Sequence, residues 1–304
     1  MPKKFDIKLI VLMSFLLIFL VIGSFFDYEI ANEVYYGQHL SDNFLGILFS
    51  YIGIIPTFVG WSFLGSSILF LRNKQCSNKI HSKLLLALGI FLLILSFLYF
   101  CNTIMLVNEK AFDVPWFIAY SIGLISVIAA AYLGYIFAKK SDNIELLNKI
   151  LFLVVVSLIT MVITMITKEI MARPRFRFVQ EMNNYEYFKN WWQSGHEIKQ
   201  SLNSNALSDE FSSFPSGHSS FSMFAIFIFP LFADYNKKIE KYRVGLFVLG
   251  VIWWAFTAFS RLTVGAHYLS DVCFGGFFTI IAYLIVVFIN TIISRRKRNI
   301  NLTE

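Results

Sequence analysis

The chain has 304 residues, of which 57% are apolar, 18% aromatic and only 15% charged. Soluble domains carry roughly 25% charged residues, so this composition excludes an ordinary soluble domain and indicates an integral membrane protein. The formal net charge of +7 does not indicate a nucleic-acid partner. The basic residues are scattered over short segments and form no basic face that a phosphate backbone could follow.

Eight apolar runs are long enough, or nearly long enough, to cross a bilayer of ~30 Å, which takes about 20 helical residues. The sixth run is short, and it reaches an adequate length only if it starts at the Pro-Ser-Gly-His turn before it and continues to about Tyr235. The predicted fold class is therefore all-α, a polytopic transmembrane bundle of about eight helices. The runs fall near residues 7–26, 45–71, 84–103, 115–138, 149–168, 219–233, 244–260 and 271–293.

The distribution of basic residues predicts the topology. Lysine and arginine are concentrated before the first run and after the second, fourth, sixth and eighth, whereas the loop 27–43 holds acidic residues and neither lysine nor arginine. By the positive-inside rule both termini are expected in the cytoplasm of a multi-pass cell-membrane protein. We expect one membrane domain over 1–304, with N-terminal helices in 1–148, a core in 149–293 and a basic cytoplasmic tail in 294–304.

Two segments on the predicted outer side are basic, against this rule. One follows the fifth run and carries Lys168, Arg173, Arg175 and Arg177, and the other follows the seventh run and carries Arg261. The positive-inside rule does not account for these cations, so we expect them to have a role other than setting the topology. For Arg173 and Arg177 the alternative is snorkelling, in which a long cationic side chain reaches the interface and does nothing more.

The outer loop 176–214 is rich in tryptophan and tyrosine. These residues favour membrane interfaces without any ligand role, so the loop is expected to form an interfacial lid or re-entrant segment, or simply to anchor at the interface. Before it, Lys168 and Arg175 are seven residues apart, two helical turns, which would place them on one side of a helix. Pro174 is expected to end that helix before Arg175.

The sequence Pro215-Ser216-Gly217-His218 precedes the sixth run. A turn of this kind opening a helix presents free backbone N–H groups and the positive end of the helix dipole, which together favour an anion. His218 stands beside that position and could deliver a proton. The alternative is an ordinary helix N-cap at Ser216 with a surface histidine after it.

The seventh run ends at Ser260-Arg261, and His267 and Asp271 follow. Four residues apart on a helix, His267 and Asp271 would share a face. The carboxylate could then accept from one imidazole nitrogen, fix the tautomer and leave the other nitrogen free as a nucleophile. Gly265 lets the chain turn between Arg261 and His267. The alternative is a structural ion pair between Arg261 and Asp271.

Taken together, the three segments resemble the signature motifs of the type 2 phosphatidic acid phosphatase (PAP2) superfamily, an integral membrane lipid phosphatase family. These motifs are Lys-x6-Arg-Pro, Pro-Ser-Gly-His and Ser-Arg-x5-His-x3-Asp. The second and third match completely, whereas in the first Phe176 stands where the motif has proline and an Arg-Pro pair comes two residues earlier. It therefore stays open whether Arg173 or Arg175 is the phosphate ligand, with Arg175 preferred on spacing. The resemblance implies a core of six helices, so two of the first four predicted here are additional.

The resemblance also implies a chemistry that needs no metal or cofactor. His267 would attack phosphorus and form a phosphohistidine, which Asp271 would orient and stabilise, while His218 would protonate the leaving oxygen and then activate water. Substrate-binding residues would neutralise the phosphoryl oxygens or donate at the helix N-terminus. They are Lys168, Arg173 or Arg175, Ser216, Gly217 and Arg261.

We therefore expect a phosphatase that acts on lipid phosphates at the extracytoplasmic membrane face, with polyprenyl (undecaprenyl) pyrophosphate as the first candidate and phosphatidylglycerophosphate or phosphatidate next. The expected partners are the lipid phosphate substrate and membrane lipids, and not nucleic acid. A phosphotransferase of the same superfamily would share every catalytic residue. A transporter or anion-binding membrane protein is the alternative from a different class, although this chain places its charges at helix ends and shows no repeated halves.

Overall fold

A computed structural model describes residues 7–37, 43–111, 116–141, 143, 145–202 and 209–300, so residues 203–208 of the predicted outer loop and the last residues of the predicted tail lie outside it. Every regular element in these residues is helical, as the sequence predicts. In chain order the elements are α1 (Ile7–Val34), α2 (Phe44–Ile52), α3 (Ile55–Gln75), α4 (Lys79–Ala111), α5 (Trp116–Lys140), α6 (Leu146–Met171), α7 (Phe176–Glu181), η1 (Tyr185–Tyr187), α8 (His196–Ser201), α9 (Gly217–Met223), α10 (Ala225–Tyr235), η3 (Lys237–Tyr242), α11 (Arg243–Thr263) and α12 (Leu269–Ile300).

Seven helices of the described chain are long and apolar enough to cross a membrane. The sixth predicted crossing is divided between α9 and α10, which meet at Phe224. Together they run from Gly217 to Tyr235, the extent that the sequence requires for an adequate span, and about 28 Å at 1.5 Å per residue. The bundle is therefore the all-α polytopic fold that the sequence predicts, with the sixth crossing built from two shorter helices.

Two predicted boundaries are wrong. The first helix does not end near residue 26, because α1 bends at Phe26, where φ is −129°, and continues to Val34. Asp27, expected in an outer loop, lies instead within this helix with only 2% of its surface exposed. The second predicted helix is divided into α2 and α3, because Pro56 at the start of α3 cannot donate the backbone hydrogen bond that a continuous helix would need.

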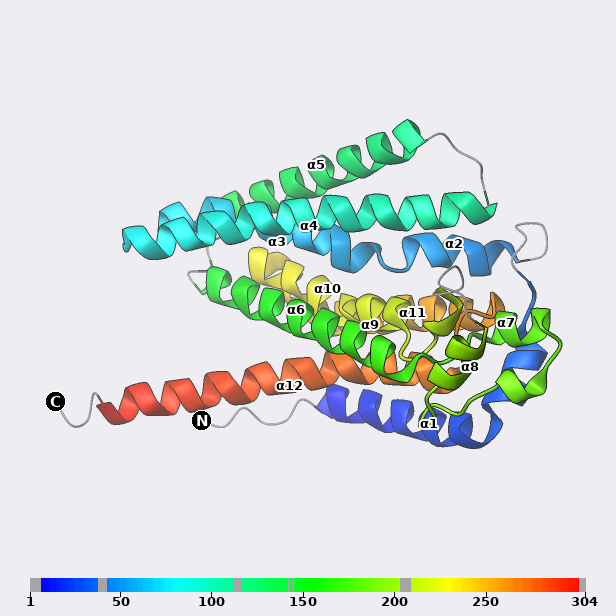
Figure 1. The fold of residues 1–304 in the computed structure, drawn as a ribbon. Coiled ribbons are helices and arrows are strands. Elements are labelled where there is room, and N and C mark those ends of the chain that lie inside the picture. The colour runs from blue at the N-terminus through cyan, green and yellow to red at the C-terminus, as the bar shows by residue number, and fades with distance from the viewer. Residues whose placement is uncertain are drawn as a thin grey trace.

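The helices form three layers (Figure 1). At the top in this view, α4 and α5 pack on α3 and on each other, which makes this peripheral pair the candidate for the two additional helices. The middle layer holds α6, α9, α10 and α11, and α12 pairs with α1 on the opposite face. Helix α9 is thus enclosed by α3, α6, α11 and α12.

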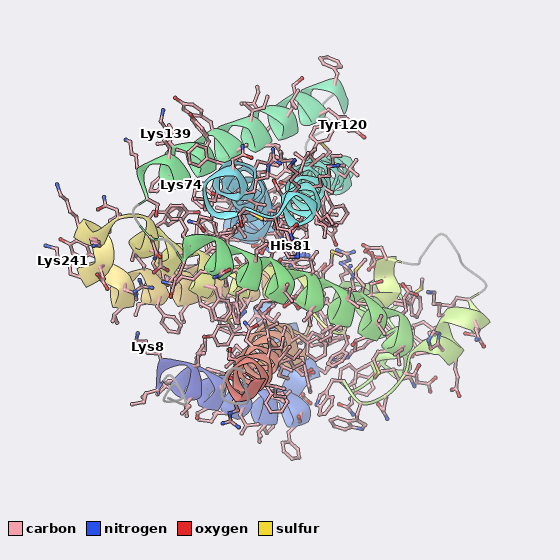
Figure 2. All side chains as sticks on the ribbon, turned by 90° about the vertical axis from the view of Figure 1, so that its left-hand side faces the viewer. Lys8, Lys74, His81, Tyr120, Lys139 and Lys241 are labelled. Atoms are coloured by element: carbon pink, nitrogen blue, oxygen red, sulfur yellow. The ribbon has the colours of Figure 1, made fainter. Side chains whose placement is uncertain are left out.

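The two ends of the bundle differ. Helices α7 and α8 lie at one end, together with the first turn of α9, while the last turns of α12 lie at the other (Figure 1). Figure 2 looks at this second end, where Lys8, Lys74, Lys139 and Lys241 mark the helix ends that face the viewer. The basic residues that the topology prediction relies on therefore gather at the end opposite to α7 and α8.

Small residues let α12 approach α9 closely. A Cβ added to Gly275 would lie 2.5 Å from the carbonyl oxygen of Ser216 and 2.8 Å from Ser219 Cβ. The hydroxyl of Ser219 donates to the Val272 carbonyl at 2.5 Å, and that of Thr279 donates to the Ser220 carbonyl at 2.6 Å. These contacts fix the first turn of α9 against α12.

Replacing Gly275 with alanine should therefore displace the start of α9. We expect Gly275→Ala to lower the melting temperature in detergent, because the added methyl group meets backbone atoms that cannot rotate away. Gly245→Ala in α11 is the control, because nothing lies within 4 Å of its Cβ position and alanine is the better helix former by about 0.5–1 kcal/mol. Thermal unfolding followed by fluorescence measures both, and equal melting temperatures for the two variants would contradict the proposed close approach.

Candidate active site

The first segment of the site is the end of α6. This helix ends at Met171, and Ala172 adopts a left-handed conformation with φ of 44°. Pro174 follows, so the helix stops before Arg175, as the sequence predicts. Arg175 is therefore placed by the turn after the helix, and not by the helical spacing from Lys168.

The second segment is the turn into α9. Ser216 is the N-cap of α9, and its side chain accepts a hydrogen bond from the backbone N–H of Ser219 at 3.3 Å. The N-cap interpretation of Ser216 is thus confirmed, but His218 is partly buried, and its Nε2 lies 3.1 Å from the carbonyl oxygen of Ser50. The cap is compatible with an anion site, because the Ser216 side chain engages the N–H of Ser219 and not the other N–H groups of this first turn.

The third segment turns between α11 and α12. Gly265 has φ of +64°, a conformation that glycine adopts without strain, and it reverses the chain after Arg261 as the sequence predicts. His267 lies in this turn and is 2% exposed, while Asp271 is fully buried in the first turn of α12. The two residues do not share a helix, because α12 begins only at Leu269.

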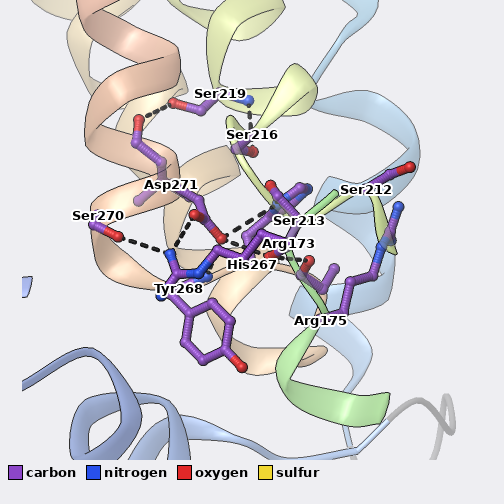
Figure 3. A network of polar contacts seen from close by, with 12 residues as sticks. Arg173, Arg175, Ser212, Ser213, Ser216, Ser219, His267, Tyr268, Ser270 and Asp271 are labelled. Atoms are coloured by element: carbon purple, nitrogen blue, oxygen red, sulfur yellow. Dashed lines mark hydrogen bonds and ion pairs between the residues drawn. The ribbon is translucent and has the colours of Figure 1, made fainter. Parts of the chain in front are cut away.

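The three segments meet at one end of the bundle. A Cβ on Gly217 would lie 3.6 Å from Lys168 Cε, which joins the first segment to the second. The backbone N–H of Ser216 donates to the Asp271 carbonyl at 3.0 Å, which joins the second to the third. Figure 3 shows this part of the site, with His267 and Asp271 beside the chain that carries Ser213 and Ser216.

His267 is held by a backbone carbonyl. Its Nδ1 donates to the Ser213 carbonyl oxygen at 2.6 Å, whereas Asp271 Oδ2 lies 3.9 Å from Nδ1, too far for a hydrogen bond. The structure thus differs from the direct bond that the sequence predicts. Asp271 is instead connected to His267 through Ser213, because Asp271 Oδ2 accepts a hydrogen bond from the Ser213 hydroxyl at 2.6 Å (Figure 3). With Nδ1 engaged, Nε2 is the ring nitrogen left to react.

The imidazole of His267 is kept neutral. Burial lowers its pKa well below the usual 6.5, and the positive charges of Lys168, Arg175 and Arg261 lower this pKa further. A buried neutral imidazole retains the lone pair that a nucleophile needs.

Each of the three cations is tied to oxygen atoms of the protein. Lys168 Nζ donates to the Ser212 carbonyl, and Arg261 Nη1 donates to the Ser50 hydroxyl. Arg175 donates through Nε to the Asp209 carbonyl at 2.8 Å and through Nη2 to Asp209 Oδ1 at 2.7 Å. The Nε of Arg261 is buried and has no hydrogen-bond partner among the described residues. An N–H group in this state is a candidate donor to an anion.

The chain was compared with known protein families. Residues 148–298 match the family described as the PAP2 superfamily. The chain belongs to the PAP2 superfamily. No match was found among curated proteins or among solved structures. The PAP2 match contains all three motif segments, whereas α1 to α5 precede it.

Within the PAP2 region, Arg173 and Arg175 have different surroundings. Arg173 is fully buried and donates to Asp27, to Asp271 and to Ser270, as well as to the Lys189 carbonyl. Arg175 faces the site, where its charge acts on His267. This geometry favours Arg175 as the phosphate ligand, the choice that the motif spacing also favours.

Snorkelling does not describe Arg173 or Arg177. Arg177 is 4% exposed, and it donates to both carboxylate oxygens of Glu210, at 2.8 and 2.5 Å, and to Asp209 at 3.1 Å. Nor does Asp271 pair with Arg261, the structural ion pair considered from the sequence, because Asp271 binds Arg173 at 2.5 Å. The ion pairs of Arg173, Arg175 and Arg177 therefore connect α1, the turn after α6 and residues 209–210 with the start of α12.

Four residues that contact the site are not marked by the motifs: Asp27, Ser50, Asp209 and Ser213. Asp27 and Asp209 are ion-pair partners of Arg173 and Arg175. Ser50 contacts both His218 and Arg261, and the Ser213 carbonyl holds His267. The segment after α7 also packs on the rest of the bundle, because Trp191 stacks on Phe214 and its indole N–H donates to the Ser24 hydroxyl of α1.

The contrast between Arg173 and Arg175 can be tested by substitution. Arg173→Gln leaves Asp27 and Asp271 buried without their cation, so we expect it to cost roughly 3–5 kcal/mol of stability. Arg175→Gln should fold, because its partner Asp209 is 56% exposed, but should lose phosphate binding. Thermal unfolding and vanadate binding measure the two effects. An Arg173→Gln variant as stable as Arg175→Gln would contradict this assignment.

Proposed function

We propose that this protein is a metal-independent lipid phosphatase that forms a phosphohistidine intermediate on His267. PAP2 membership and the membrane-helix bundle support a role of the lipid phosphatase type. The observation that carries the mechanism is the hydrogen bond of the His267 ring, in which Nδ1 donates to the Ser213 carbonyl and leaves Nε2 as the nitrogen that can react.

In the first step, Nε2 of His267 attacks phosphorus while the bond from phosphorus to the leaving oxygen breaks. Charge on the phosphoryl oxygens is neutralised by Lys168, Arg175 and Arg261, with further donors in the first turn of α9. The imidazole becomes cationic in this step, and the carboxylate of Asp271, 3.9 Å from Nδ1, stabilises it.

His218 supplies the proton to the leaving oxygen. It enters the cycle as an imidazolium whose Nε2–H donates to the Ser50 carbonyl at 3.1 Å, so the proton on Nδ1 is the one that passes to the leaving oxygen. In the second step, the same nitrogen takes a proton from water, which attacks the phosphohistidine and releases phosphate. Both histidines then return to their starting states.

The substrate is proposed to be a lipid phosphate that reaches the site from the bilayer. The motif segments lie at the end of apolar helices, and the lysine-rich helix ends lie at the opposite end (Figures 1 and 2). By the positive-inside rule this arrangement favours an extracytoplasmic site and cytoplasmic termini. Polyprenyl pyrophosphate is therefore the first candidate, followed by phosphatidylglycerophosphate and phosphatidate.

Phosphate release from this panel of lipids tests the proposal. Wild type should release phosphate, and His267→Ala and His218→Ala should each lose at least about 10³-fold in kcat, because each removes a group that reacts directly. His81→Ala is the matched control, since His81 is exposed at the opposite end of the bundle and should have no effect (Figure 2). Wild type and the control should form an acid-labile phosphoryl adduct, and His267→Ala should not.

Four outcomes would contradict parts of the proposal. Near-normal turnover by His267→Ala would refute the nucleophile. Loss of activity with EDTA that Mg²⁺ restores would refute metal independence. Transfer of phosphate to an acceptor other than water would make the protein a phosphotransferase, and anion transport that survives both histidine substitutions would make it a carrier.

The depressed pKa of His267 also predicts a pH dependence. Because burial and the neighbouring cations disfavour the imidazolium, His267 stays unprotonated as the pH falls through 6.5. We therefore expect the acid limb of kcat/KM to lie below pH 6.5, since kcat/KM reports the free enzyme. A pH series with a soluble short-chain lipid phosphate measures it. An acid limb at or above 6.5 would show that His267 is not held in this environment.

A further inference from the structure

Asp27 is a charged residue buried in α1, a largely apolar helix. It follows the bend in α1 at Phe26, and 2% of its surface is exposed. Burying a carboxylate among helices is costly unless cations and hydrogen-bond donors surround it, so such a residue calls for an explanation. Asp27 lies outside residues 148–298, the part of the chain that matches PAP2.

Both carboxylate oxygens of Asp27 are engaged at the site. Oδ2 accepts from Arg173 Nη2 at 2.9 Å, and Oδ1 accepts from the backbone N–H of Ser270 at 2.9 Å. The Ser270 hydroxyl donates to Oδ2 as well. Asp27 thus binds the residue immediately before Asp271 and the arginine that pairs with Asp271.

Arg173 connects the two carboxylates. Its Nη1 donates to Asp271 Oδ1 at 2.5 Å and to the Ser270 hydroxyl at 2.9 Å, and its Nη2 donates to Asp27. The guanidinium lies 4.1 Å from the centre of the Tyr268 ring, which covers one of its faces. Figure 3 shows the part of this network around Arg173, Ser270 and Asp271.

The charges in this network do not cancel. The Arg173 guanidinium lies between the carboxylates of Asp27 and Asp271. When both carboxylates are ionised, these three buried side chains together carry one net negative charge. Asp271 uses Oδ1 for Arg173 and keeps Oδ2 for the Ser213 hydroxyl and the Tyr268 N–H. The oxygen that approaches His267 is therefore the one that Arg173 does not bind.

We propose that Asp27 is a positioning residue for the His267 nucleophile, acting through Arg173. Asp27 shares the guanidinium of Arg173 with Asp271. This sharing leaves Oδ2 of Asp271 directed at Ser213 and keeps the negative charge of Asp271 beside His267. This inference rests on the proposed function, because it concerns the imidazolium that His267 becomes when it attacks phosphorus.

Without the charge of Asp27, Arg173 has a single carboxylate partner. A guanidinium and one carboxylate favour a bidentate pair, which would draw Oδ2 of Asp271 away from Ser213. The Ser213 carbonyl would then hold His267 less firmly, and the imidazolium would lose negative charge nearby. Both changes act on the chemical step more than on substrate binding.

Asp27→Asn tests this, with Glu29→Gln as the matched control. Glu29 lies on the same helix two residues later and is exposed, so its variant removes the same charge away from the site. We expect kcat of Asp27→Asn to fall roughly 10- to 100-fold, the range that loss of an outer partner costs in metal sites, with KM changed by less than about two-fold. Glu29→Gln should match wild type.

The pH profile is a second measurement, and a loss of stability alone would not change it. Removing a negative charge disfavours the imidazolium, so the acid limb of kcat/KM should shift to lower pH in Asp27→Asn and not in Glu29→Gln. The titratable and charged groups that face His267 from the surrounding elements are unchanged in both variants. They are Lys168, Arg175, His218, Arg261 and Asp271.

The outcomes are distinguishable. If neither wild type nor Glu29→Gln releases phosphate from any lipid phosphate, the result contradicts the proposed function and not the role of Asp27. If wild type is active and Asp27→Asn has the same kcat and acid limb, or loses activity only in proportion to its folded fraction, the inference is overturned. Should Asp27→Asn not fold, Ser270→Ala removes the hydroxyl shared by Asp27 and Arg173 without changing charge, and a wild-type kcat there overturns the inference.

Discussion

Repulsion among like charges is the constraint on which this structure depends. Lys168, Arg175 and Arg261 are brought near one buried imidazole, and their charges oppose its protonation. Three cations at a membrane rim would separate if nothing held them, because their repulsion is weakly screened where water is excluded. The fold holds each against an oxygen atom of the protein, at Ser212, at Asp209 and at Ser50 respectively.

Two polar contacts of the site come from helices that precede the PAP2 region. Asp27 comes from α1 and Ser50 from α2, both before residue 148. Helix α1 lies along α12 and delivers its carboxylate to Arg173, while α2 lies beside α11 and delivers a hydroxyl to Arg261. Helices α4 and α5 lie in the layer farthest from α12 and supply none of the site contacts described above (Figure 1).

The sequence could predict what is local. Apolar runs, basic loops and a glycine at the turn are properties of neighbouring residues, so the helical class of the fold and the turn at Gly265 were accessible from it. The motif residues were accessible because their types and spacing are distinctive. Predicting that His267 and Asp271 would hydrogen-bond failed because α12 starts two residues after His267, and the carbonyl of Ser213 is nearer.

The sequence could not predict contacts between residues far apart in the chain, or contacts made by backbone groups. Asp27 and Arg173 are 146 positions apart, and nothing separates Asp27 in type from the acidic residues that follow it in α1. The contact of Ser213 with His267 uses a carbonyl group that every residue has. The break between α9 and α10 falls at Phe224, a residue with no special tendency to end a helix, so packing rather than local preference sets it.

A consequence for catalysis follows from how these charges are held. Arginines fixed by carbonyl and carboxylate groups do not need to reorient when a phosphoryl group arrives, which is the condition for strong electrostatic stabilisation of a transition state. Arg175 shares its guanidinium with the exposed carboxylate of Asp209, so a phosphate competes there with a group of the same charge. The buried Nε of Arg261 meets no such competitor within the described residues. The geometry thus favours anions that bring more than one negative charge, because these can replace Asp209 at Arg175 while Arg261 still gains a partner.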